Sequence, residues 1–293
     1  MDLKQLEKIK KLAIIAMFSD DDLMEKLVLK GGNALDIVHK VALRASVDLD
    51  FSIENEFNEQ ELHITEVKIQ KVLRDTFRAE GYQVFDITFS KRPERITPDM
   101  AAFWGGYVVE FKIIETDKHD QLQADIDSVR RQAIVVGERQ KTKMKIDISK
   151  FEYCRSKQES ELDGYTVYVY TPEMIVCEKL RAICQQMPEY ARTVKNPSRS
   201  ARARDFFDIH TVVEHFKIDL TNTENIQLLR NIFAAKKVPL NLLGKIETYR
   251  EFHRSSFVAV KDTVKASEEL RGFDFYFDYV VAKCRDLKPP WIV

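Results

Sequence analysis

The chain has 293 residues, of which 44% are hydrophobic and 32% are charged. This composition is typical of a globular protein and excludes a disordered or fibrous one. Lys and Arg together number 46, and Asp and Glu 47, so the formal net charge is −1. A positive field over the whole molecule is therefore excluded, and any contact with nucleic acid has to come from a local basic patch.

Membrane insertion and secretion are not predicted. No segment reaches the roughly 18 consecutive apolar residues that a transmembrane helix needs. The N-terminal segment is charged and amphipathic and lacks the small-residue cleavage site of a signal peptide. The cysteines show no CxxC spacing and fit buried thiols in a reducing cytoplasm better than a zinc site. They are Cys154, Cys177, Cys184 and Cys284.

The first 170 residues alternate helical and extended patterns. Apolar residues at helical spacing predict helices over about 3–18 and 59–80, the second ending at Gly81. Asp20, Asp21 and Asp22 offer N-caps and first-turn acids for a short helix that runs through Leu27. Further helical patterns are expected at 33–41 and 119–136. Strands are expected at 47–53, 82–89, 105–114, 143–149 and 165–170.

The pattern changes at Thr171, an N-cap residue that is followed by Pro172 at the first helical position. The remaining helical segments are expected at 204–216, 225–235, 240–262 and 266–287. Short strands interspersed with helices, followed by helices alone, indicate an α+β fold. We therefore predict a mixed-sheet domain over 1–170 and a helical bundle over 171–293.

The most informative segment runs from Lys30 to Phe51. The backbone N–H groups of Gly31 and Gly32 can approach a phosphate closely, and the start of the following helix attracts its charge. Asp48 and Asp50 alternate along an extended segment, so both carboxylates project from one face. Two such oxygen ligands suit Mg²⁺ beside a triphosphate, and without a cation they repel each other. A metal-dependent nucleotide site is indicated; the alternative is a solvated sheet face beside a turn.

These residues resemble a known family. Lys-Gly-Gly-Asn-Ala-Leu at 30–35 and Arg-x-Ser-x-Asp-Leu-Asp-Phe at 44–51 are similar to the first signature of the AbiEii/AbiGii toxin family of nucleotidyltransferases, in the DNA polymerase β-like superfamily. The resemblance implies a nucleotidyltransferase fold for the N-terminal domain. It also implies nucleotide contacts, with Asn33 standing where Thr or Ser is usual. The implied contacts are made by Lys30, Gly31, Gly32, Asn33, Arg44 and Ser46.

Two later segments extend the resemblance. Residues 171–182 are similar to the second signature, a helix with a lysine that contacts the NTP phosphates, which implies this role for Lys179. Residues 202–209 are similar to the third signature, which implies that Asp205 is a catalytic or orienting acid and Asp208 its structural companion. Their spacing places both acids on one helical face. The implied catalytic set is Asp48, Asp50, Lys179 and Asp205.

Members of the superfamily often carry a third carboxylate on a neighbouring strand. Asp147 is the favoured candidate, because it alternates with Ile146 and Ile148 in an extended segment. Glu110 is the alternative candidate. The other possibility is that Asp147 is an exposed strand acid without a catalytic role. The metal ligands expected for Mg²⁺ or Mn²⁺ are therefore Asp48, Asp50 and Asp147.

A basic segment at 191–204 contains no acid and predicts contact with RNA phosphates. The alternative is a solvated loop between helices. A second basic block leads into the Asp147 strand and carries Arg139, Lys141, Lys143 and Lys145. The predicted RNA-binding residues of the first segment are Arg192, Lys195, Arg199, Arg202 and Arg204.

The family resemblance implies the toxin of a toxin–antitoxin or abortive-infection system. It implies transfer of a nucleotide from an NTP, with tRNA acceptor ends as one substrate class and a cognate antitoxin protein as a partner. We therefore expect Mg²⁺-dependent transfer to RNA, with tRNA as the acceptor. Transfer to a protein or small molecule, and a non-catalytic nucleotide-binding module, are the alternatives.

Overall fold

The computed structural model describes residues 3–41, 48–122, 124–137, 139–194, 199–261 and 270–287. The chain divides into two compact units. The sheet unit comprises Met1–Val38 and Ser46–Val169, and the helical unit comprises His39–Ala45 and Tyr170–Val293. Strands occur in the first unit and helices dominate the second, so the predicted α+β class is confirmed.

The described part of the sheet unit forms a single seven-stranded sheet with the order β3-β4-β5-β2-β1-β7-β6. The β2–β5 and β1–β7 pairs are parallel and the other pairs are antiparallel. The sheet is therefore mixed. Its strands are β1 (Val28–Lys30), β2 (Leu49–Ser52), β3 (Tyr82–Arg92), β4 (Gly106–Glu115), β5 (Met144–Ser149), β6 (Gln158–Leu162) and β7 (Tyr165–Val169).

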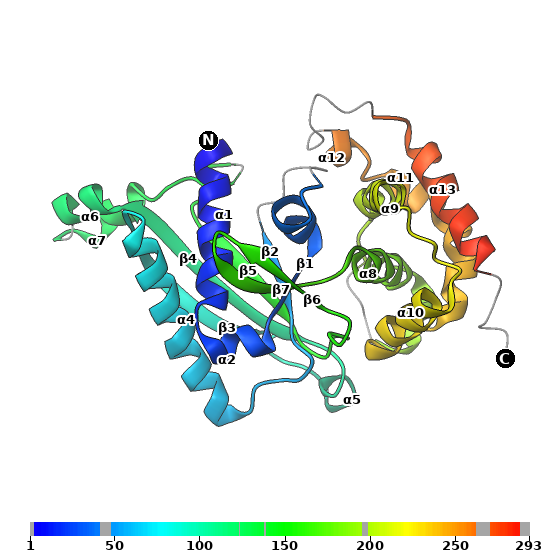
Figure 1. Cartoon of the computed structure of the whole chain (residues 1–293), viewed down its shortest axis with the longest axis horizontal. Helices are drawn as coiled ribbons and strands as arrows, with labels where there is room; N and C mark the ends of the chain where they lie inside the picture. The colour runs from blue at the N-terminus through cyan, green and yellow to red at the C-terminus, as the bar shows by residue number, and fades with distance from the viewer. Residues whose placement is uncertain are drawn as a thin grey trace. The chain divides into compact units, whose positions relative to one another are not determined.

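Helices α1 (Leu3–Phe18) and α4 (Glu59–Ala79) lie side by side across one face of the sheet (Figure 1). Ring contacts join the layers: Phe18 of α1 packs on Phe51 of β2, and Phe77 of α4 packs on Phe111 of β4. These four rings are buried. Because side chains alternate along a strand, the residues between the buried ones point to the opposite face of the sheet.

The other elements of the sheet unit are short. Helix α2 (Asp21–Lys26) begins as predicted, with the Asp20 carboxylate accepting from the Leu23 N–H at 3.1 Å. Helix α3 (Gly31–Asn33) continues into a π-helical turn, η1 (Ala34–Val38). Two short helices replace the single one predicted over 119–136, because Asp125 caps a new helix start. These helices are α6 (Thr116–Leu122) and α7 (Ile126–Arg131), and the remaining one is α5 (Pro98–Ala101).

The β6–β7 hairpin was not predicted from the sequence. Its turn consists of Asp163 and Gly164, which both have positive φ angles, 49° and 86°. An Asp-Gly pair suits a two-residue turn with both residues in the left-handed region. Strand β6 itself is mostly polar and forms by pairing with β7.

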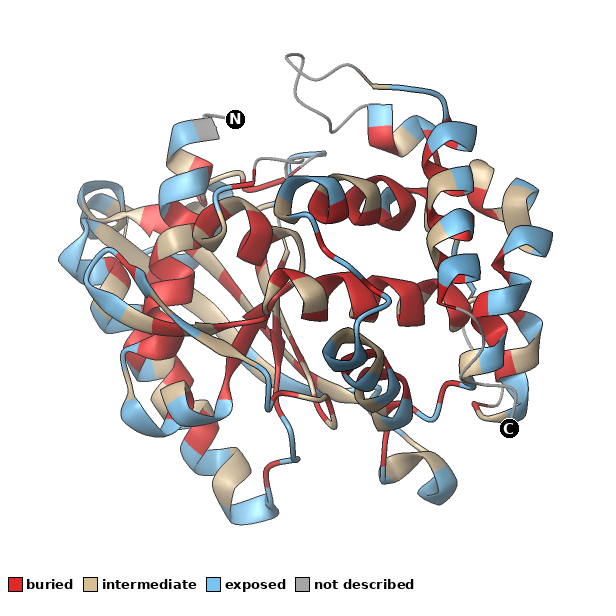
Figure 2. Cartoon of the chain, turned by 45° about the vertical axis from the view of Figure 1, so that its right-hand side comes forward, coloured by how far each residue is buried: buried red, intermediate tan, exposed pale blue. Residues whose placement is uncertain are grey.

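In the helical unit, α8 (Pro172–Cys184) begins as predicted, with the Thr171 hydroxyl accepting from the Met174 N–H. Buried residues occur on all sides of α8, and many lie on α9 (Ala203–Phe216) (Figure 2). The single helix predicted over 240–262 was wrong. The chain forms shorter segments there, the first of them a 3-10 helix that contains Gly244, a poor helix former.

The rest of the described helical unit surrounds these helices. The last helix was predicted to span 266–287. Residues 262–269 lie outside the described part of the chain. The elements are η2 (Pro188–Arg192), α10 (Thr223–Ala235), η3 (Leu240–Tyr249), α11 (Arg250–Arg254), α12 (Val258–Lys261) and α13 (Phe273–Asp286).

None of the described helices has the length and apolarity needed to cross a bilayer. The four cysteines are buried free thiols, as expected.

Candidate active site

The glycine turn lies directly against one of the two predicted acids. Strand β1 ends at Lys30, and Gly31 opens α3 with a φ of 71°. A Cβ atom added to Gly31 would lie 2.8 Å from Oδ2 of Asp50. Position 31 therefore favours glycine for its backbone conformation, and a side chain there would displace the Asp50 carboxylate.

Three predicted residues form a row across three neighbouring strands. Lys30 of β1 is the register partner of Asp50 of β2, and Asp50 is the register partner of Asp147 of β5. Register partners project from the same face of a sheet, on strands about 4.8 Å apart. Asp48 precedes Asp50 by two residues. This row lies on the face opposite the buried Phe51 and helices α1 and α4.

The register also distinguishes the two candidates for a third carboxylate. Asp147 lies on β5, the strand directly paired with β2. Glu110 lies one strand further away, on β4, where its register partner is Lys145. Ile146 and Ile148 are buried, as the alternation predicted. The geometry therefore favours Asp147 over Glu110 as the neighbour of Asp50.

Basic side chains compensate these carboxylates. The Lys141 ammonium lies 3.3 Å from Oδ1 of Asp48, and Arg92 Nη1 lies 3.4 Å from Oδ1 of Asp147. Lys145 also pairs with Asp147. Among the described residues, no three His, Cys, Asp or Glu side chains are gathered to hold a metal ion. The carboxylates thus have the oxygen chemistry that Mg²⁺ requires, but they face cationic side chains of the protein.

The basic block before β5 was noted from the sequence as a candidate addition to the basic patch of 191–204, and Arg92 was given no role. Lys143 of that block pairs with Glu110 at 2.9 Å. Arg92 reaches Asp147 because antiparallel pairing aligns the end of β3 with the start of β4, which in turn pairs with β5. No local motif marks this residue, and only the strand order brings it to the site.

Two other predicted nucleotide contacts are engaged within the sheet unit. The Lys30 ammonium lies 3.6 Å from Oε1 of Glu152, and both side chains are buried. Asn33 is buried and hydrogen-bonded to Lys10 and to the backbone of Asp48. Arg44 and Ser46, also predicted to contact the nucleotide, lie outside the described residues.

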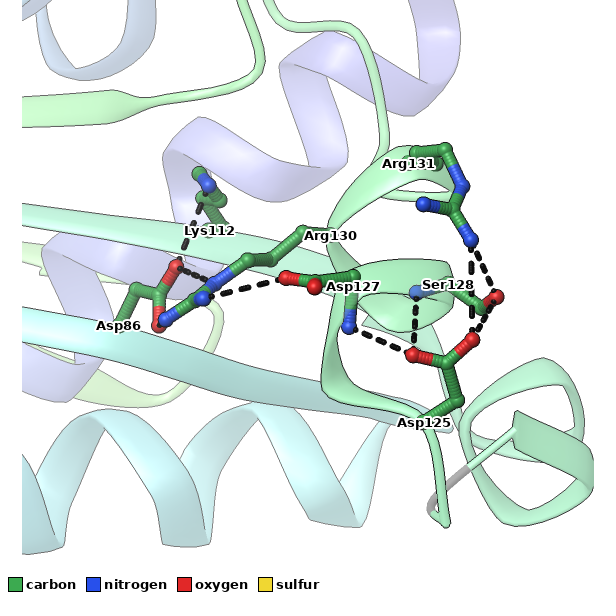
Figure 3. Close-up of polar contacts among 7 residues, drawn as sticks. All are labelled: Asp86, Lys112, Asp125, Asp127, Ser128, Arg130 and Arg131. Carbon is green, nitrogen blue, oxygen red and sulfur yellow. Dashed lines mark hydrogen bonds and ion pairs between the residues drawn. The ribbon is translucent and has the colours of Figure 1, made fainter.

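A polar cluster fixes α7 to the sheet (Figure 3). Asp86 lies at an irregularity in the β3–β4 register and has a φ of 49°. The Arg130 guanidinium donates to both Asp86 carboxylate oxygens at 3.0 Å, and Lys112 donates at 3.2 Å. The hydrogen bond from Arg130 lowers the pKa of Asp86. This cluster anchors the beginning of the segment that leads to Lys141.

The helical unit contains the other predicted catalytic pair. The Lys179 ammonium of α8 donates to Oδ1 of Asp205 at 3.1 Å and to Oδ2 of Asp208 at 2.6 Å. Arg202 also pairs with Asp205. Lys179 and both aspartates are buried. Burial alone would raise the pKa of Asp205, but the charges of Arg202 and Lys179 outweigh it and hold the pKa below its ordinary value.

The start of α9 is capped from a distant part of the chain. Arg202 provides no side-chain cap. The backbone N–H of Arg202 donates to Nδ1 of His253 at 3.1 Å, and that of Ala203 donates to Ser256 Oγ at 3.1 Å. Burial lowers the pKa of His253 to about 4, so the imidazole is neutral. Residues without any motif therefore position the helix that carries Asp205.

The basic residues of 191–204 differ in their surroundings. Arg192 is exposed at the end of η2. Arg199 donates to the Gln186 carbonyl and lies over the Phe252 ring. Arg204 donates to the Ala259 carbonyl at 3.4 Å, and Arg202 pairs with Asp205 as described above. Lys195 lies outside the described residues.

An α+β core that carries an acidic strand residue against a glycine turn fits the nucleotidyltransferase that the sequence resemblance predicts. The chain belongs to the AbiEii family, the nucleotidyl transferase toxins of type IV toxin–antitoxin systems, whose sequence model matches residues 13–279. The match spans all the predicted site residues, and the predicted family is confirmed. Among curated proteins, no match was found.

Three solved structures resemble the chain at low sequence identity. JHP933 from Helicobacter pylori is 14% identical, with 97% of this chain and 90% of that one covered and a TM-score of 0.49. A candidate nucleotidyltransferase from H. pylori is 15% identical, with 98% and 96% covered and a TM-score of 0.49. An antigenic nucleotidyltransferase-like protein from Paracoccidioides brasiliensis is 12% identical, with 91% and 97% covered and a TM-score of 0.38.

We expect the Gly31→Ala variant to lose activity because its methyl group collides with the Asp50 carboxylate. Displacing a catalytic group by about 1 Å can cost roughly 100-fold in rate. The left-handed backbone adds about 1–2 kcal/mol of destabilisation. Gly81→Ala is the matched control, since Gly81 has a φ of 81° and open space around its Cα. Equal transfer rates for the two variants would contradict the proposed importance of the contact.

Proposed function

We propose that the chain transfers a nucleotide from an NTP to RNA, with tRNA as the acceptor, and that Asp48, Asp50 and Asp147 hold the Mg²⁺ or Mn²⁺ that the reaction uses. The observation that carries this proposal is the register of Asp50 with Asp147, on the sheet face where the Gly31 backbone meets the Asp50 carboxylate. This arrangement supports a phosphate placed beside the Asp50 and Asp147 carboxylates.

Each group of the sheet unit has a defined task in this proposal. A divalent cation held by the three aspartates would neutralise charge on the triphosphate and on the leaving pyrophosphate. The first-turn N–H groups of Gly31 and Gly32 lack acceptors within α3 and suit phosphate oxygens. With the carboxylates acting as metal ligands, their present partners would be free to bind phosphate oxygens. Those partners are Lys141, Lys145 and Arg92.

The family resemblance assigns Lys179 to the NTP phosphates and Asp205 to a catalytic or orienting role. The buried pairing of Lys179 with Asp205 and Asp208 supports the orienting role. A charged hydrogen bond to each carboxylate fixes the direction of the ammonium, which a flexible lysine side chain would otherwise not hold.

The acceptor assignment rests on charge. Residues 191–204 carry five basic side chains and no acid, which supports contact with a polyanion. Arg192 is exposed and is the strongest candidate for a phosphate contact among the described members. A cognate antitoxin is the expected partner, and co-expression of the adjacent reading frame should relieve growth arrest caused by the toxin.

The test is incubation of the purified chain with each labelled NTP, total tRNA and Mg²⁺ or Mn²⁺, with a chelator as control. Metal-dependent label in the tRNA band, absent with Asp48→Asn, is the expected result. Label in a protein band or a small molecule would replace RNA with another acceptor. No label in any fraction, together with an unchanged cellular phenotype for Asp48→Asn, would leave a non-catalytic nucleotide-binding module.

A further inference from the structure

A chain of buried polar contacts runs from α1 to the backbone of Asp48. Lys10 of α1 is 4% exposed and Asn33 of α3 is 1% exposed. The Lys10 ammonium donates to Oδ1 of Asn33 at 3.1 Å. Nδ2 of Asn33 donates to the Asp48 carbonyl at 2.6 Å. Asp36 lies 3.9 Å from the same ammonium and contributes further negative charge.

The orientation of the Asn33 amide follows from chemistry. A lysine ammonium can only donate, so the atom of Asn33 that faces Lys10 has to be the oxygen. The amide nitrogen then faces the Asp48 carbonyl, which can only accept. Reversing the amide would place two donors together at one end and two acceptors together at the other. Lys10 thus fixes the direction in which Asn33 donates.

The hydrogen bond acts where the sheet gives little support. Strand β2 begins at Leu49, which is the first β2 residue paired with β5. Asp48 lies just before it, outside the ladder, and its side chain is about half exposed. Asn33 therefore holds the backbone of this acid, while Gly31, two residues earlier, lies against Asp50.

We propose that Asn33, oriented by Lys10, is a positioning residue that fixes the Asp48 backbone and does not itself contact the nucleotide. The proposal rests on the proposed function, in which Asp48 is a metal ligand. Both ends of the Asn33 amide are engaged within the protein and the residue is 1% exposed, so its burial keeps it from contact with a phosphate. Asn33 links the glycine turn to the first acid through the interior of the sheet unit.

The decisive variant is Asn33→Asp, which has nearly the same shape. It still accepts from Lys10 but presents an oxygen in place of the donor to the Asp48 carbonyl. Loss of a buried hydrogen bond corresponds to about a tenfold effect. We expect about tenfold weaker Mn²⁺ binding by the free protein, measured by electron paramagnetic resonance. We also expect kcat to fall about tenfold or more while the KM for NTP stays within about twofold of wild type.

Two controls separate positioning from stability. Asn58→Ala removes the N-cap of α4, where Asn58 accepts from the Glu61 N–H at 2.9 Å, and should lower the unfolding midpoint without changing metal binding. Lys10→Met removes the ammonium that orients Asn33 and should reproduce part of the Asn33→Asp defect. Lys8→Met is its match on α1, because Lys8 is half exposed and pairs with Glu80.

Amide hydrogen exchange tests the role of Asn33 independently of the proposed function. We expect faster amide exchange over residues 48–52 in Asn33→Asp and wild-type exchange there in Asn58→Ala. If wild type transfers no label, the proposed function fails, but this exchange result still tests the Asn33 link. Wild-type exchange in Asn33→Asp would overturn the link. A raised KM for NTP with unchanged kcat would instead make Asn33 a direct nucleotide ligand.

Discussion

We expect the Asp50→Asn variant to lose nucleotide transfer, with kcat lowered by at least about 100-fold, the effect of removing one electrostatic contact in an active site. Asparagine keeps the shape of the side chain but removes its charge. Asp50 is the central member of the row that includes Lys30 and Asp147, and its carboxylate lies against Gly31. The rate of label transfer from NTP to tRNA under saturating metal measures the effect.

The same variant should fold normally. Asp50 lies opposite Asp147 on one side and opposite Lys30 on the other, so the charge that asparagine removes has one repulsive and one attractive neighbour. We therefore expect an unfolding midpoint close to that of wild type. Asp163→Asn is the control, because Asp163 has a positive φ that asparagine tolerates and lies in the β6–β7 turn. Retention of more than about a tenth of wild-type activity by Asp50→Asn would refute its assignment as a metal ligand.

The parts of the fold that follow from local chemistry could be predicted from the sequence. Asp20 and Thr171 cap helices because their side-chain oxygens accept first-turn N–H groups. Ile146 and Ile148 alternate with Asp147, which identifies a strand with one buried face. Such signals lie within a few residues of each other, so no knowledge of the tertiary fold is needed to interpret them.

The mispredicted elements depend on tertiary partners. Strand β6 is largely polar and is extended because it pairs with β7 across the Asp163–Gly164 turn. Residues 240–262 keep a helical apolar spacing although the chain forms a 3-10 segment, α11 and α12 in the described part of this range. Local spacing identifies the face that is buried, but it does not distinguish a continuous helix from shorter helical segments that bury the same face.

The site residues also divide into those that local sequence identifies and those that depend on the tertiary fold. Gly31, Asp48 and Asp50 could be selected from one short segment. The adjacency of Asp147, by contrast, depends on parallel pairing between strands that are distant in the sequence. Arg92 and His253 carry no motif, and their roles follow from strand order and from helix packing. From the sequence, Asn33 was included in the site and predicted to contact the nucleotide. Its buried hydrogen bonds support a positioning role instead. Its partner Lys10 is revealed only by the structure.

We expect Lys179→Met to be the most destabilising single substitution among those considered, at about 3–5 kcal/mol, because it leaves buried carboxylates without their ammonium partner. Methionine has a similar length and no charge. Lys179 hydrogen-bonds to both Asp205 and Asp208, and all three side chains are buried. Urea unfolding at neutral pH measures the loss. Lys245→Met is the control, a half-exposed lysine paired with Glu189, and should cost less than about 1 kcal/mol.

The pH dependence identifies the cause of that loss. The folded-state pKa of Asp205 lies below its unfolded value, so its ion pairs contribute stability that is complete above the unfolded pKa of about 3.9 and is lost as the pH falls through the folded value. Without the ammonium, the pKa of Asp205 should rise, so the stability difference between wild type and Lys179→Met should shrink towards pH 4. Adding Asp208→Asn to Lys179→Met should recover part of the loss at neutral pH, because it removes a buried carboxylate that has lost its ammonium partner, whereas Asp205 keeps Arg202. A pH-independent difference, with no recovery in the double variant, would mean that lost packing around the lysine stem, and not charge, accounts for the effect.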